Sequence, residues 1–534
     1  MIGTAWWQRA IIYEVYPRSF ADANGDGVGD LRGLIEHLDY LVELGVDALW
    51  LSPIFRSPMA DFGYDIEDYC GIDPLFGTLA DVDALVAAAR ARDLRLILDF
   101  VPNHTSDRHP WFLASRSSRT DPKRDWYLWR DPAPDGGPPT NWLSHFGGGA
   151  WEWDEGTRQY YLHSFLPQQP DLNWRNPAVR AAMADVLRFW LDRGIDGFRV
   201  DVLWLLVKDD RYRDNPVNPS WREGESSYER LLPLYTSDRP EVHEIVAEMR
   251  GVLDAYGDRV LIGEIYLPVE RLVTYYGHDL RGAQLPFNFA LIGTAWNADA
   301  LAALIREYEA ALPPGAWPNW VLGNHDKPRI ATRVGAAQAR VAAMLLLTLR
   351  GTPTLYYGDE LGMVDVTIAP KAVRDPAERR QPGIGMGRDP QRTPLPWDSS
   401  PLGGFTTGVP WLPLGEHDSV NVATLSADPG SMLALYRQLI AVRKAQPALV
   451  AGTLDAVAAH GSVLAYERRL GSTSLQVILN LGHDPVRVPT SAKRILLSTT
   501  LARSGESVDA TVTLAADEGV IVLSATDASS PAIE

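Results

Sequence analysis

Short apolar runs that end in polar, chargeable residues recur along this chain, and they constrain its fold more than any other feature. Five of them are residues 96–104, 197–202, 261–266, 321–326 and 355–360. In each run the polar side chains gather towards the C-terminal end, which is the end that carries the active site in a parallel α/β barrel. The pattern therefore predicts a barrel whose functional residues come from several different strands.

The same pattern extends to eight strand-like runs, separated by amphipathic stretches with apolar residues at i, i+3 and i+4. The predicted strands are residues 11–17, 48–53, 94–101, 197–202, 260–266, 283–289, 319–325 and 352–358. The predicted helices include residues 34–44, 81–92, 178–193, 242–256 and 337–349. Alternating strands and helices predict a parallel sheet, and eight strands predict an α/β protein with a closed (β/α)8 TIM barrel.

Two segments depart from the barrel pattern. Residues 104–172 are rich in Trp, Tyr, Pro, Gly and Asp and too long for a plain loop, so they predict a small domain inserted after the third strand. Residues 449–534 alternate apolar and polar side chains between turns, which predicts a C-terminal antiparallel β-sandwich domain. The barrel is then expected to comprise residues 1–103 and 173–448, with an irregular segment at 361–430 on its catalytic face.

Composition limits the partners that this protein can have. The chain of 534 residues has a net charge of −18, which disfavours nucleic acid, anionic membranes and densely anionic substrates. Its single cysteine, Cys70, cannot form an intrachain disulfide and is expected to be a small, buried apolar residue. The N-terminus shows no secretory pattern, and the longest apolar run, 341–349, is shorter than the ~20 residues of a membrane span. We therefore expect a cytoplasmic monomer or homodimer that acts on small neutral molecules and binds neither nucleic acid nor membrane.

The sharpest chemical motif is GFRVD at residues 197–201. Residues two apart on a strand point to the same side, so Arg199 and Asp201 are expected to lie together. A neighbouring guanidinium lowers the pKa of a carboxyl group, and a carboxylate that stays ionised suits a nucleophile. A purely structural ion pair at a strand end is the alternative interpretation.

Two more carboxylates stand at the ends of predicted strands. Glu264 ends an almost wholly apolar run, and apolar surroundings raise the pKa of a carboxyl group as a general acid requires. A buried, hydrogen-bonded structural Glu is an equal alternative at that position. Asp326 follows His325, and His104 follows the third strand, so two imidazoles accompany three carboxylates, a set that fits hydrogen bonding to sugar hydroxyls. A pair of carboxylates across a scissile bond is the minimum equipment for glycoside hydrolysis.

These motifs, in this order, resemble those of the α-amylase family, which is family 13 of the glycoside hydrolases. Four conserved regions of that family are matched by residues 99–104, 197–201, 264 and 324–326. Residues 169–173 (QPDLN) resemble the fifth region as it occurs in the α-glucosidase and oligo-1,6-glucosidase branch. The run 201–206 (DVLWLL) is similar to bacterial α-glucosidases of the Thermus type.

The resemblance implies a retaining, exo-acting α-glucosidase for short oligosaccharides such as maltose, isomaltose or sucrose, with transglucosylation as a side activity and no organic cofactor. It implies that Asp201 is the nucleophile, Glu264 the acid/base and Asp326 the stabiliser of the transition state. The implied substrate-binding residues are Asp61, Tyr64, His104, Arg199, His325 and Arg392. Asp61 and Arg392 are expected to grip the far edge of the terminal glucose and close the pocket, although the same loop also contains Arg388.

An acidic loop at residues 22–30 (DANGDGVGD) has oxygen-bearing side chains at alternate positions, as in an EF-hand. Gly33 stands where an EF-hand has its bidentate Glu, so the loop is not an EF-hand. In the α-amylase family it resembles a structural Ca²⁺ or Mg²⁺ site. The implied ligands are Asp22, Asn24, Asp26, the carbonyl group of Val28, and Asp30. A metal-free turn is the alternative.

Two other functions remain open at this point. A sucrose or maltose isomerase of the same family, forming trehalulose, isomaltulose or trehalose, would use the same carboxylates, but the sequence lacks the charged loop expected of sucrose isomerases. A catalytically dead sugar-binding or transporter-associated subunit would lack the carboxylates that this chain retains. The preferred linkage is also open, although Val202 resembles the residue associated with α-1,6 acceptance.

Overall fold

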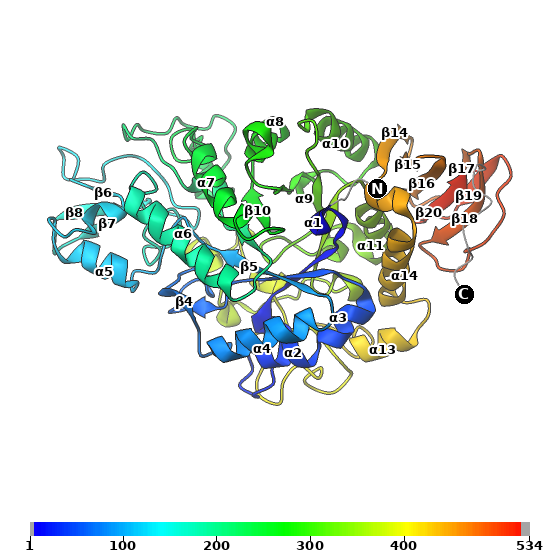
Figure 1. Cartoon of the computed structure of the whole chain (residues 1–534), viewed down its shortest axis with the longest axis horizontal. Coiled ribbons are helices and arrows are strands. Elements are labelled where there is room, and N and C mark those ends of the chain that lie inside the picture. The colour runs from blue at the N-terminus through cyan, green and yellow to red at the C-terminus, as the bar shows by residue number, and fades with distance from the viewer. Residues whose placement is uncertain (1–4, 525–534) are drawn as a thin grey trace.

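A barrel of eight parallel strands forms the centre of the computed structural model, which describes residues 5–524 (Figure 1). The sheet order is β11-β10-β9-β5-β2-β1-β13-β12, and the two end strands, β11 and β12, contact each other, which closes the ring. The strands are β1 Ile12–Val15, β2 Ala48–Leu51, β5 Arg95–Phe100, β9 Gly197–Val200, β10 Val260–Ile265, β11 Leu285–Asn288, β12 Asn319–Val321 and β13 Thr352–Tyr356. All eight predicted barrel strands are confirmed.

Both faces of the barrel strands are buried, which explains why their sequences are continuously apolar. In β1, Ile12 belongs to a cluster that also contains Trp50, Ile262 and Phe287 from other barrel strands. Tyr13, the next residue along β1, belongs to the larger cluster shared with the surrounding helices. Alternate residues thus serve two apolar environments, as expected of a parallel sheet covered on both sides.

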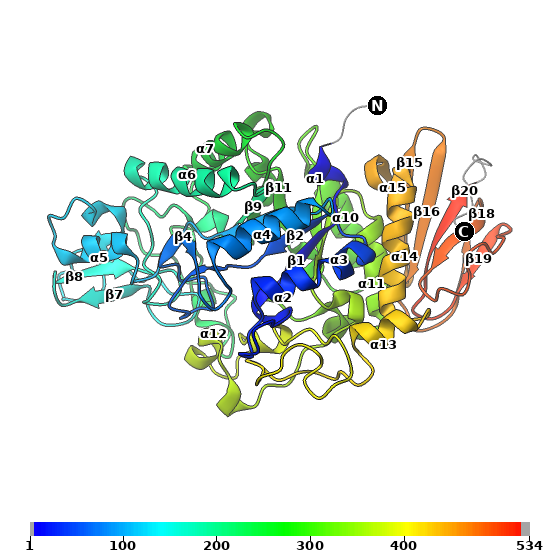
Figure 2. The ribbon, with the colours of Figure 1, turned by 60° about the horizontal axis from the view of Figure 1, so that its bottom comes forward.

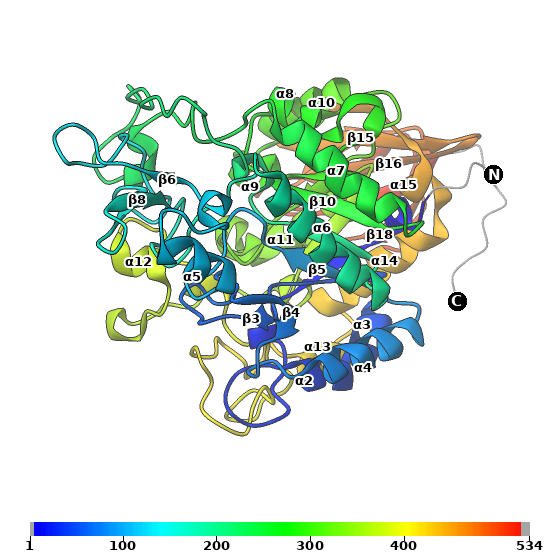
Figure 3. The ribbon, with the colours of Figure 1, turned by 60° about the vertical axis from the view of Figure 1, so that its left-hand side comes forward.

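Helices surround the strands in all three views (Figures 1, 2 and 3). They include α2 Leu31–Glu36, α3 Leu38–Leu44, α4 Leu79–Arg90, α6 Pro177–Asp192, α7 Val242–Asp254, α10 Ala298–Ala311, α11 Ile330–Thr348 and α14 Met432–Ala445. The predicted helix 34–44 is in fact two helices that meet at His37. The predicted helix 337–349 corresponds to the part of α11 that follows Gly335, whose φ of 81° breaks the regular helical backbone between Ile330 and Thr348.

Within residues 5–524, α11 is the one helix that is long and apolar enough, by composition, to cross a membrane. However, 61% of its apolar window is buried in the protein. Gln338 donates a hydrogen bond to Asp517 at 2.6 Å, and Arg340 donates one to the carbonyl oxygen of Thr499 at 2.8 Å. These contacts make α11 a core helix that connects the barrel to the C-terminal sheet, longer than the nine-residue apolar run in the sequence suggests.

The segment between β5 and β9 forms a small antiparallel sheet of its own, at one end of the molecule in Figure 1. Its strands are β6 Trp129–Arg130, β7 Trp151–Asp154 and β8 Gln159–Leu162, and α5 Pro110–Ser117 precedes them. The helix α12 Pro376–Arg380, from the irregular segment after β13, contacts the loop that leads to β7. Arg380 donates hydrogen bonds to the carbonyl oxygens of Phe146 and Gly147 at 3.3 and 2.9 Å. The limits of the inserted domain at 104 and 172 stay predictions.

The C-terminal part of the chain is antiparallel, as predicted. Five strands form one sheet in the order β14-β15-β16-β20-β18, and β17 pairs with β19 in a second, smaller sheet. The strands are β14 Thr453–His460, β15 Val463–Leu470, β16 Thr473–Asn480, β17 Val486–Pro489, β18 Ala492–Ser498, β19 Thr511–Leu514 and β20 Gly519–Ser524. Ile478 and Val522 of the large sheet share an apolar cluster with Val512 of the small one, so the two sheets pack on each other. Residues 525–534 of the predicted domain lie outside the described residues.

Candidate active site

The carboxyl ends of the barrel strands open into a cavity of about 560 Å³. Six of the nine predicted catalytic and substrate-binding residues line it: Asp61, Tyr64, His104, Asp201, Glu264 and Asp326. Arg199, His325 and Arg392 lie behind this wall and contact residues that form it. The structure therefore gathers the predicted residues at the predicted end of the barrel, in two layers.

One guanidinium group holds three carboxylates at the ends of neighbouring strands. Arg199 on β9 lies 2.8 Å from Asp99, 2.8 Å from Asp201 and 2.7 Å from Glu264. The strands that carry these residues, β5, β9 and β10, are adjacent in the barrel. Parallel pairing of those strands brings the nucleophile and acid/base candidates onto the same cation.

Burial controls the protonation of this cluster. It raises the pKa of Asp201 well above the ordinary value; Arg199 opposes the shift, while Glu264 and Asp99 add to it. Burial also raises the pKa of Glu264, again against Arg199. The predicted contact between Arg199 and Asp201 exists and lowers the pKa of Asp201, but burial acts in the opposite direction, and one cation shared by three carboxylates cannot neutralise them all. We expect the cluster to retain a proton near neutrality.

The hydrogen bonds of Glu264 indicate which of its two oxygens would carry the proton that the cluster retains. The N–H of Val202 donates a hydrogen bond to Oε2 at 2.8 Å, and Nη2 of Arg199 also contacts Oε2. Two donors on the same oxygen suit the carbonyl oxygen of a protonated acid. Oε1 is then the hydroxyl oxygen that can deliver a proton.

Asp326 differs from the other two carboxylates because two arginines and a histidine ring lie beside it. Nη2 of Arg392 lies 2.7 Å from Oδ1, Arg388 lies 3.5 Å away, and Nε2 of His325 lies 3.4 Å from Oδ2. Burial alone would raise the pKa of Asp326, but His325 and the arginines outweigh burial and hold the pKa well below its ordinary value. A carboxylate that stays charged suits the stabilisation of a cationic transition state.

Arg388, not Arg392, is the partner of Asp61. Nη2 of Arg388 lies 2.6 Å from Asp61 and 2.8 Å from Asp375. Arg392 is fully buried and instead contacts Asp326 and donates to the carbonyl oxygen of His325 at 2.7 Å. The predicted pairing of Asp61 with Arg392 is therefore wrong. A 3₁₀ turn over Asp389–Gln391 separates the two arginines, so both reach Asp326 but only Arg388 also contacts Asp61.

The loop that carries Asp61 is held in a strained backbone conformation. Met59 and Phe62 on either side of it have φ of 63° and 52°, in the left-handed region. The carboxylate of Asp65 accepts hydrogen bonds from the N–H groups of Ala60 and Asp61 at 2.8 and 2.9 Å. Burial raises the pKa of Asp65 to about 6. Asp65 thus fixes the direction in which Asp61 enters the cavity.

His104 and the QPDLN motif meet beside Asp61 in the wall of the cavity. Nε2 of His104 lies 3.0 Å from the carbonyl oxygen of Tyr64 and 3.2 Å from Nε2 of Gln169. Burial lowers the pKa of His104 to about 4, so the ring is neutral at neutral pH. The same Gln169 amide donates to Asp61 at 3.3 Å, and Asp171 pairs with the buried Lys208 at 2.6 Å. The motif therefore forms and supports part of the cavity wall.

Several cavity residues were not predicted from the sequence. His145 stacks between Phe165, at a ring separation of 4.9 Å, and Tyr228, at 3.7 Å, on one wall. These three residues lie outside the strands and α-helices, in segments without a periodic pattern of apolar residues. Glu14, which contacts His325, did leave a signal: it is the one acidic residue inside the first predicted strand.

The acidic loop at 22–30 shows no formed metal site. Among residues 5–524, no group of three or more His, Cys, Asp or Glu side chains is arranged to hold a metal ion. Asp22 accepts N–H groups of Asn24, Gly25 and Gly27. Within the same loop, Asn24 and Asp26 accept the N–H groups of Asp26 and Val28, and Asp30 accepts that of Gly33. The oxygens satisfy the loop backbone in this arrangement, and metal binding stays a prediction.

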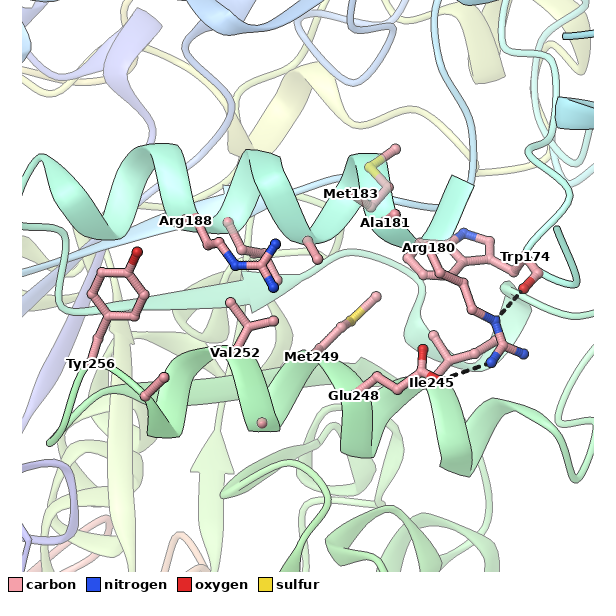
Figure 4. Close-up of a pocket in the computed structure, with 14 residues that line it drawn as sticks. Trp174, Arg180, Ala181, Met183, Arg188, Ile245, Glu248, Met249, Val252 and Tyr256 are labelled. Atoms are coloured by element: carbon pink, nitrogen blue, oxygen red, sulfur yellow. Dashed lines mark hydrogen bonds and ion pairs between the residues drawn. The ribbon is translucent and has the colours of Figure 1, made fainter. Parts of the chain in front are cut away.

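A second cavity, of about 380 Å³, lies on the outside of the barrel between α6 and α7 (Figure 4). Its walls are mostly apolar, as at Met183, Leu187 and Met249. Its one acidic residue, Glu248, pairs with Arg180 at 2.9 Å. The groove lacks the paired carboxylates of the first cavity and is not a second candidate for the chemistry.

Comparison with known proteins agrees with this site. A family model described as "Alpha amylase, catalytic domain" matches residues 14–452, and one described as "Domain of unknown function (DUF3459)" matches 452–522. A probable alpha-glucosidase of Rhizobium meliloti (strain 1021) is 41% identical, over 92% of each chain. An oligo-1,6-glucosidase of Parageobacillus thermoglucosidasius is 38% identical, over 92% of this chain and 94% of the relative.

Solved structures give the same result. The alpha-glucosyl transfer enzyme XgtA superimposes with a TM-score of 0.93 at 40% identity, over 98% of this chain and 100% of that one. A variant of the trehalulose synthase MutB reaches a TM-score of 0.90 at 35% identity, over 97% of this chain and 100% of that one. A barrel with paired carboxylates at its strand ends fits a glycoside hydrolase, and the relatives named alpha-glucosidase and oligo-1,6-glucosidase show that this is the class. The chain belongs to the α-amylase family, as its motifs predicted.

Proposed function

We propose that this protein is a retaining, exo-acting α-glucosidase that hydrolyses the terminal α-glucosidic bond of short oligosaccharides. The observation that carries the proposal is that one guanidinium, Arg199, holds both Asp201 and Glu264 inside a single cavity. Two carboxylates that share a cation but differ in their hydrogen bonds can divide the roles of nucleophile and acid. The α-glucosidase and oligo-1,6-glucosidase names of the relatives support the choice of an α-glucoside.

The proposed reaction has two steps. Asp201 attacks the anomeric carbon while the proton on Glu264 passes to the glycosidic oxygen, so that the leaving sugar departs neutral and a glucosyl–Asp201 ester forms. Glu264, now ionised, takes a proton from water as the water attacks the ester, which releases α-glucose and restores Asp201. Asp326, kept anionic by its arginines, stabilises the positive charge that develops on the sugar ring in both steps.

The exo mode and the preference for short substrates are proposed from the Asp61–Arg388 pair. This pair lies in the cavity wall, and Asp375 anchors the arginine from behind. A wall of paired, buried charges leaves no room for a second sugar beyond the terminal glucose. The cavity must then bind any further sugars on the leaving-group side alone.

Transglucosylation is proposed as a side activity. An alcohol or sugar hydroxyl that replaces water in the second step would accept the glucosyl group from Asp201. The high structural similarity to the alpha-glucosyl transfer enzyme XgtA supports this step. The ratio of transfer to hydrolysis depends on how well the cavity retains the acceptor.

A product-resolved substrate panel tests the proposal. Maltose, isomaltose, sucrose, trehalose and maltotriose are incubated with the wild-type protein, and the products and their anomeric form are identified. We expect α-glucose as the first product, with Asp201→Asn reducing turnover by several orders of magnitude and Glu264→Gln impairing maltose more than an activated aryl glucoside. Release of β-glucose would overturn the retaining mechanism, and rapid loss of starch viscosity would overturn the exo mode.

A sucrose isomerase is the second candidate, because structures of trehalulose and isomaltulose synthases superimpose with TM-scores of 0.90 and 0.89. An isomerase would rejoin the glucosyl group to fructose before fructose leaves the cavity. Incubation with sucrose as the sole substrate distinguishes a hydrolase from an isomerase. Glucose and fructose in equal amounts support hydrolysis, whereas trehalulose or isomaltulose as the main product would replace our first proposal.

Three further properties are proposed from the sequence. The oxygen-rich loop at 22–30 is a candidate for structural Ca²⁺ or Mg²⁺, on the strength of its alternating pattern. The single cysteine, half-buried Cys70, fits a cytoplasmic location. The protein is proposed to work as a monomer or homodimer, which light scattering at several concentrations would test.

A further inference from the structure

A buried carboxyl group that the proposed mechanism does not use lies directly behind the cavity. Glu14, on β1, has no exposed surface, and its Oε1 lies 2.5 Å from Nδ1 of His325. Within residues 5–524, its other oxygen, Oε2, has no hydrogen-bond partner. Glu14 does not line the cavity, and its hydrogen bond to His325 connects it to residues that do.

The ring of His325 cannot easily change its orientation. It stacks between Tyr64, at a centroid distance of 5.4 Å, and Tyr16, at 5.8 Å, with interplanar angles of 18° on both sides. Trp50 packs against it at 6.0 Å with its ring tilted by 66°. With the ring fixed, the variable that remains is which nitrogen carries hydrogen.

The hydrogen bonds of Tyr64 indicate whether Nε2 of His325 carries a hydrogen. Its hydroxyl group has one proton and lies 3.1 Å from Oδ2 of Asp99 and 2.7 Å from Nε2 of His325. Asp99 also receives N–H groups from Arg199 and Trp50, so donors surround it and it acts as an acceptor. The tyrosine proton therefore goes to Asp99, and the tyrosine oxygen accepts a hydrogen from Nε2.

The contact at Nδ1 then needs a proton of its own. An acceptor nitrogen and an ionised carboxylate would repel each other at 2.5 Å, so one hydrogen must lie between Nδ1 and Glu14. Because Nε2 already carries hydrogen, a proton resting on Nδ1 would make His325 a cation. Arg392 and Arg388, both near Asp326, would repel a further cation at this place.

We propose that Glu14 is a positioning residue that, as a neutral acid, donates a hydrogen bond to Nδ1 of His325 and so keeps hydrogen on Nε2, towards Tyr64 and Asp326. The inference rests on the proposed glucosidase function for its kinetic consequence. Burial supports the proposal at both groups. It raises the pKa of Glu14 well above its ordinary value, and it lowers the pKa of His325 well below its ordinary value. Arg199 opposes the shift at Glu14, and Asp326 opposes it at His325.

The kinetic test compares two substitutions of Glu14. Glu14→Gln keeps a donor to Nδ1, so we expect kcat on an aryl α-glucoside within about threefold of wild type. Glu14→Leu has similar volume but no donor, so His325 loses its fixed tautomer, and we expect kcat to fall by at least tenfold with a smaller change in KM. Equal losses in the two variants would show that an ionised Glu14 is required, and an unaffected Glu14→Leu would show that Glu14 positions nothing.

Glu360 supplies a matched control. It is also fully buried at a strand end, but its carboxylate accepts hydrogen bonds from Tyr13, Tyr40 and Gly358 and contacts no cavity residue. Glu360→Gln should lower Tm while leaving kcat unchanged. A parallel fall of kcat in Glu360→Gln and Glu14→Leu would mean that the loss reflects general packing, which would overturn the proposal.

A spectroscopic measurement separates this inference from the proposed function. In protein labelled with ¹⁵N-histidine, the His325 signals are assigned by their absence in His325→Gln. We expect a neutral ring with hydrogen on Nε2 in wild type and in Glu14→Gln. An imidazolium, or hydrogen on Nδ1, would overturn the proposal even if the enzyme cleaves α-glucosides. If the wild type cleaved none, the proposed function would fail, and the ring spectrum would still decide the role of Glu14.

Discussion

Val202 holds the acid/base candidate Glu264 through its backbone, in a conformation that a valine rarely adopts. Its φ of 38° and ψ of 46° lie in the left-handed region, which is a true outlier for a β-branched residue. That conformation aims the N–H at Oε2 of Glu264, at 2.8 Å. Strain of this kind persists where the surrounding structure over-determines it, and it gathers at functional sites.

A substitution that makes the backbone at Val202 more flexible should therefore lower kcat. Val202→Gly relaxes the strained backbone, whereas Val202→Ala removes the same side chain from the cavity but keeps the residue restricted. We expect kcat on maltose to be several-fold lower in the Gly than in the Ala variant, because a hydrogen bond worth about 1 kcal/mol loosens. Ala456→Gly, at φ 53° in β14, is the matched control and should leave kcat unchanged. Identical kcat in both Val202 variants would contradict the role of the backbone.

The Asp61–Arg388 pair should control binding of the terminal glucose. Asp61 is only 3% exposed, and removing the partner of a buried charge costs about 3–5 kcal/mol. Arg388→Leu should lower kcat/KM for maltose at least a hundredfold, and Arg388→Lys should recover part of the loss. Arg379→Leu, a nearby exposed arginine that donates to the carbonyl oxygen of Val373, serves as control and should have no effect. A kcat/KM near wild type in Arg388→Leu would argue that another group closes the pocket.

Asp359 should make stability fall with rising pH. It is buried, and burial raises its pKa to about 7 against an ordinary 3.8, with Arg329 opposing the shift. Between these two values the folded state binds more protons than the unfolded state, so its stability drops as pH rises through about 7. Asp359→Asn can still accept the N–H of Tyr356, and it removes the titration. Its advantage over wild type in the free energy of unfolding should grow by on the order of 2 kcal/mol between pH 5 and pH 8, which appears as a widening difference in Tm. A constant Tm difference would refute the shift.

The barrel and its three carboxylates were predictable because both have a local signature. Strands covered on both faces are apolar throughout, so a polar residue at the end of one, such as Glu264, is conspicuous. The contact between Arg199 and Asp201 followed from the two-residue period of a strand. These predictions needed no knowledge of which strands are neighbours.

The rest of the site depends on neighbours that the sequence does not reveal. Glu14 on β1 meets His325, which follows β12, only because β13 pairs with both strands in the barrel order. The choice between Arg388 and Arg392 lies in an irregular segment without periodicity, so no pattern tells which one reaches Asp61. The shared use of Arg199 by three carboxylates likewise required the adjacency of β5, β9 and β10.

The acidic loop at 22–30 gives a prediction for metal removal that separates the ion from the loop itself. Asp22 accepts the hydroxyl of Thr406 at 2.5 Å as well as loop N–H groups, so its loss would damage the loop with or without a metal. Asp26 accepts a single N–H, from Val28, and Asp26→Asn keeps that acceptor while it removes the charge a cation needs.

If Ca²⁺ or Mg²⁺ binds this loop, chelation should lower the Tm of the wild type by a few degrees, in line with the roughly 2.7 kcal/mol that a ligand at a hundred times its Kd contributes. The loop contacts the segment before Trp411, which packs on Phe62 beside Asp61, but it contains no group that the chemistry uses. The kcat measured well below Tm should therefore survive chelation. Asp26→Asn should show the lowered Tm without chelator and no further response to it. A wild type whose Tm is the same in chelator and in millimolar Ca²⁺ or Mg²⁺ would establish the loop as a metal-free turn.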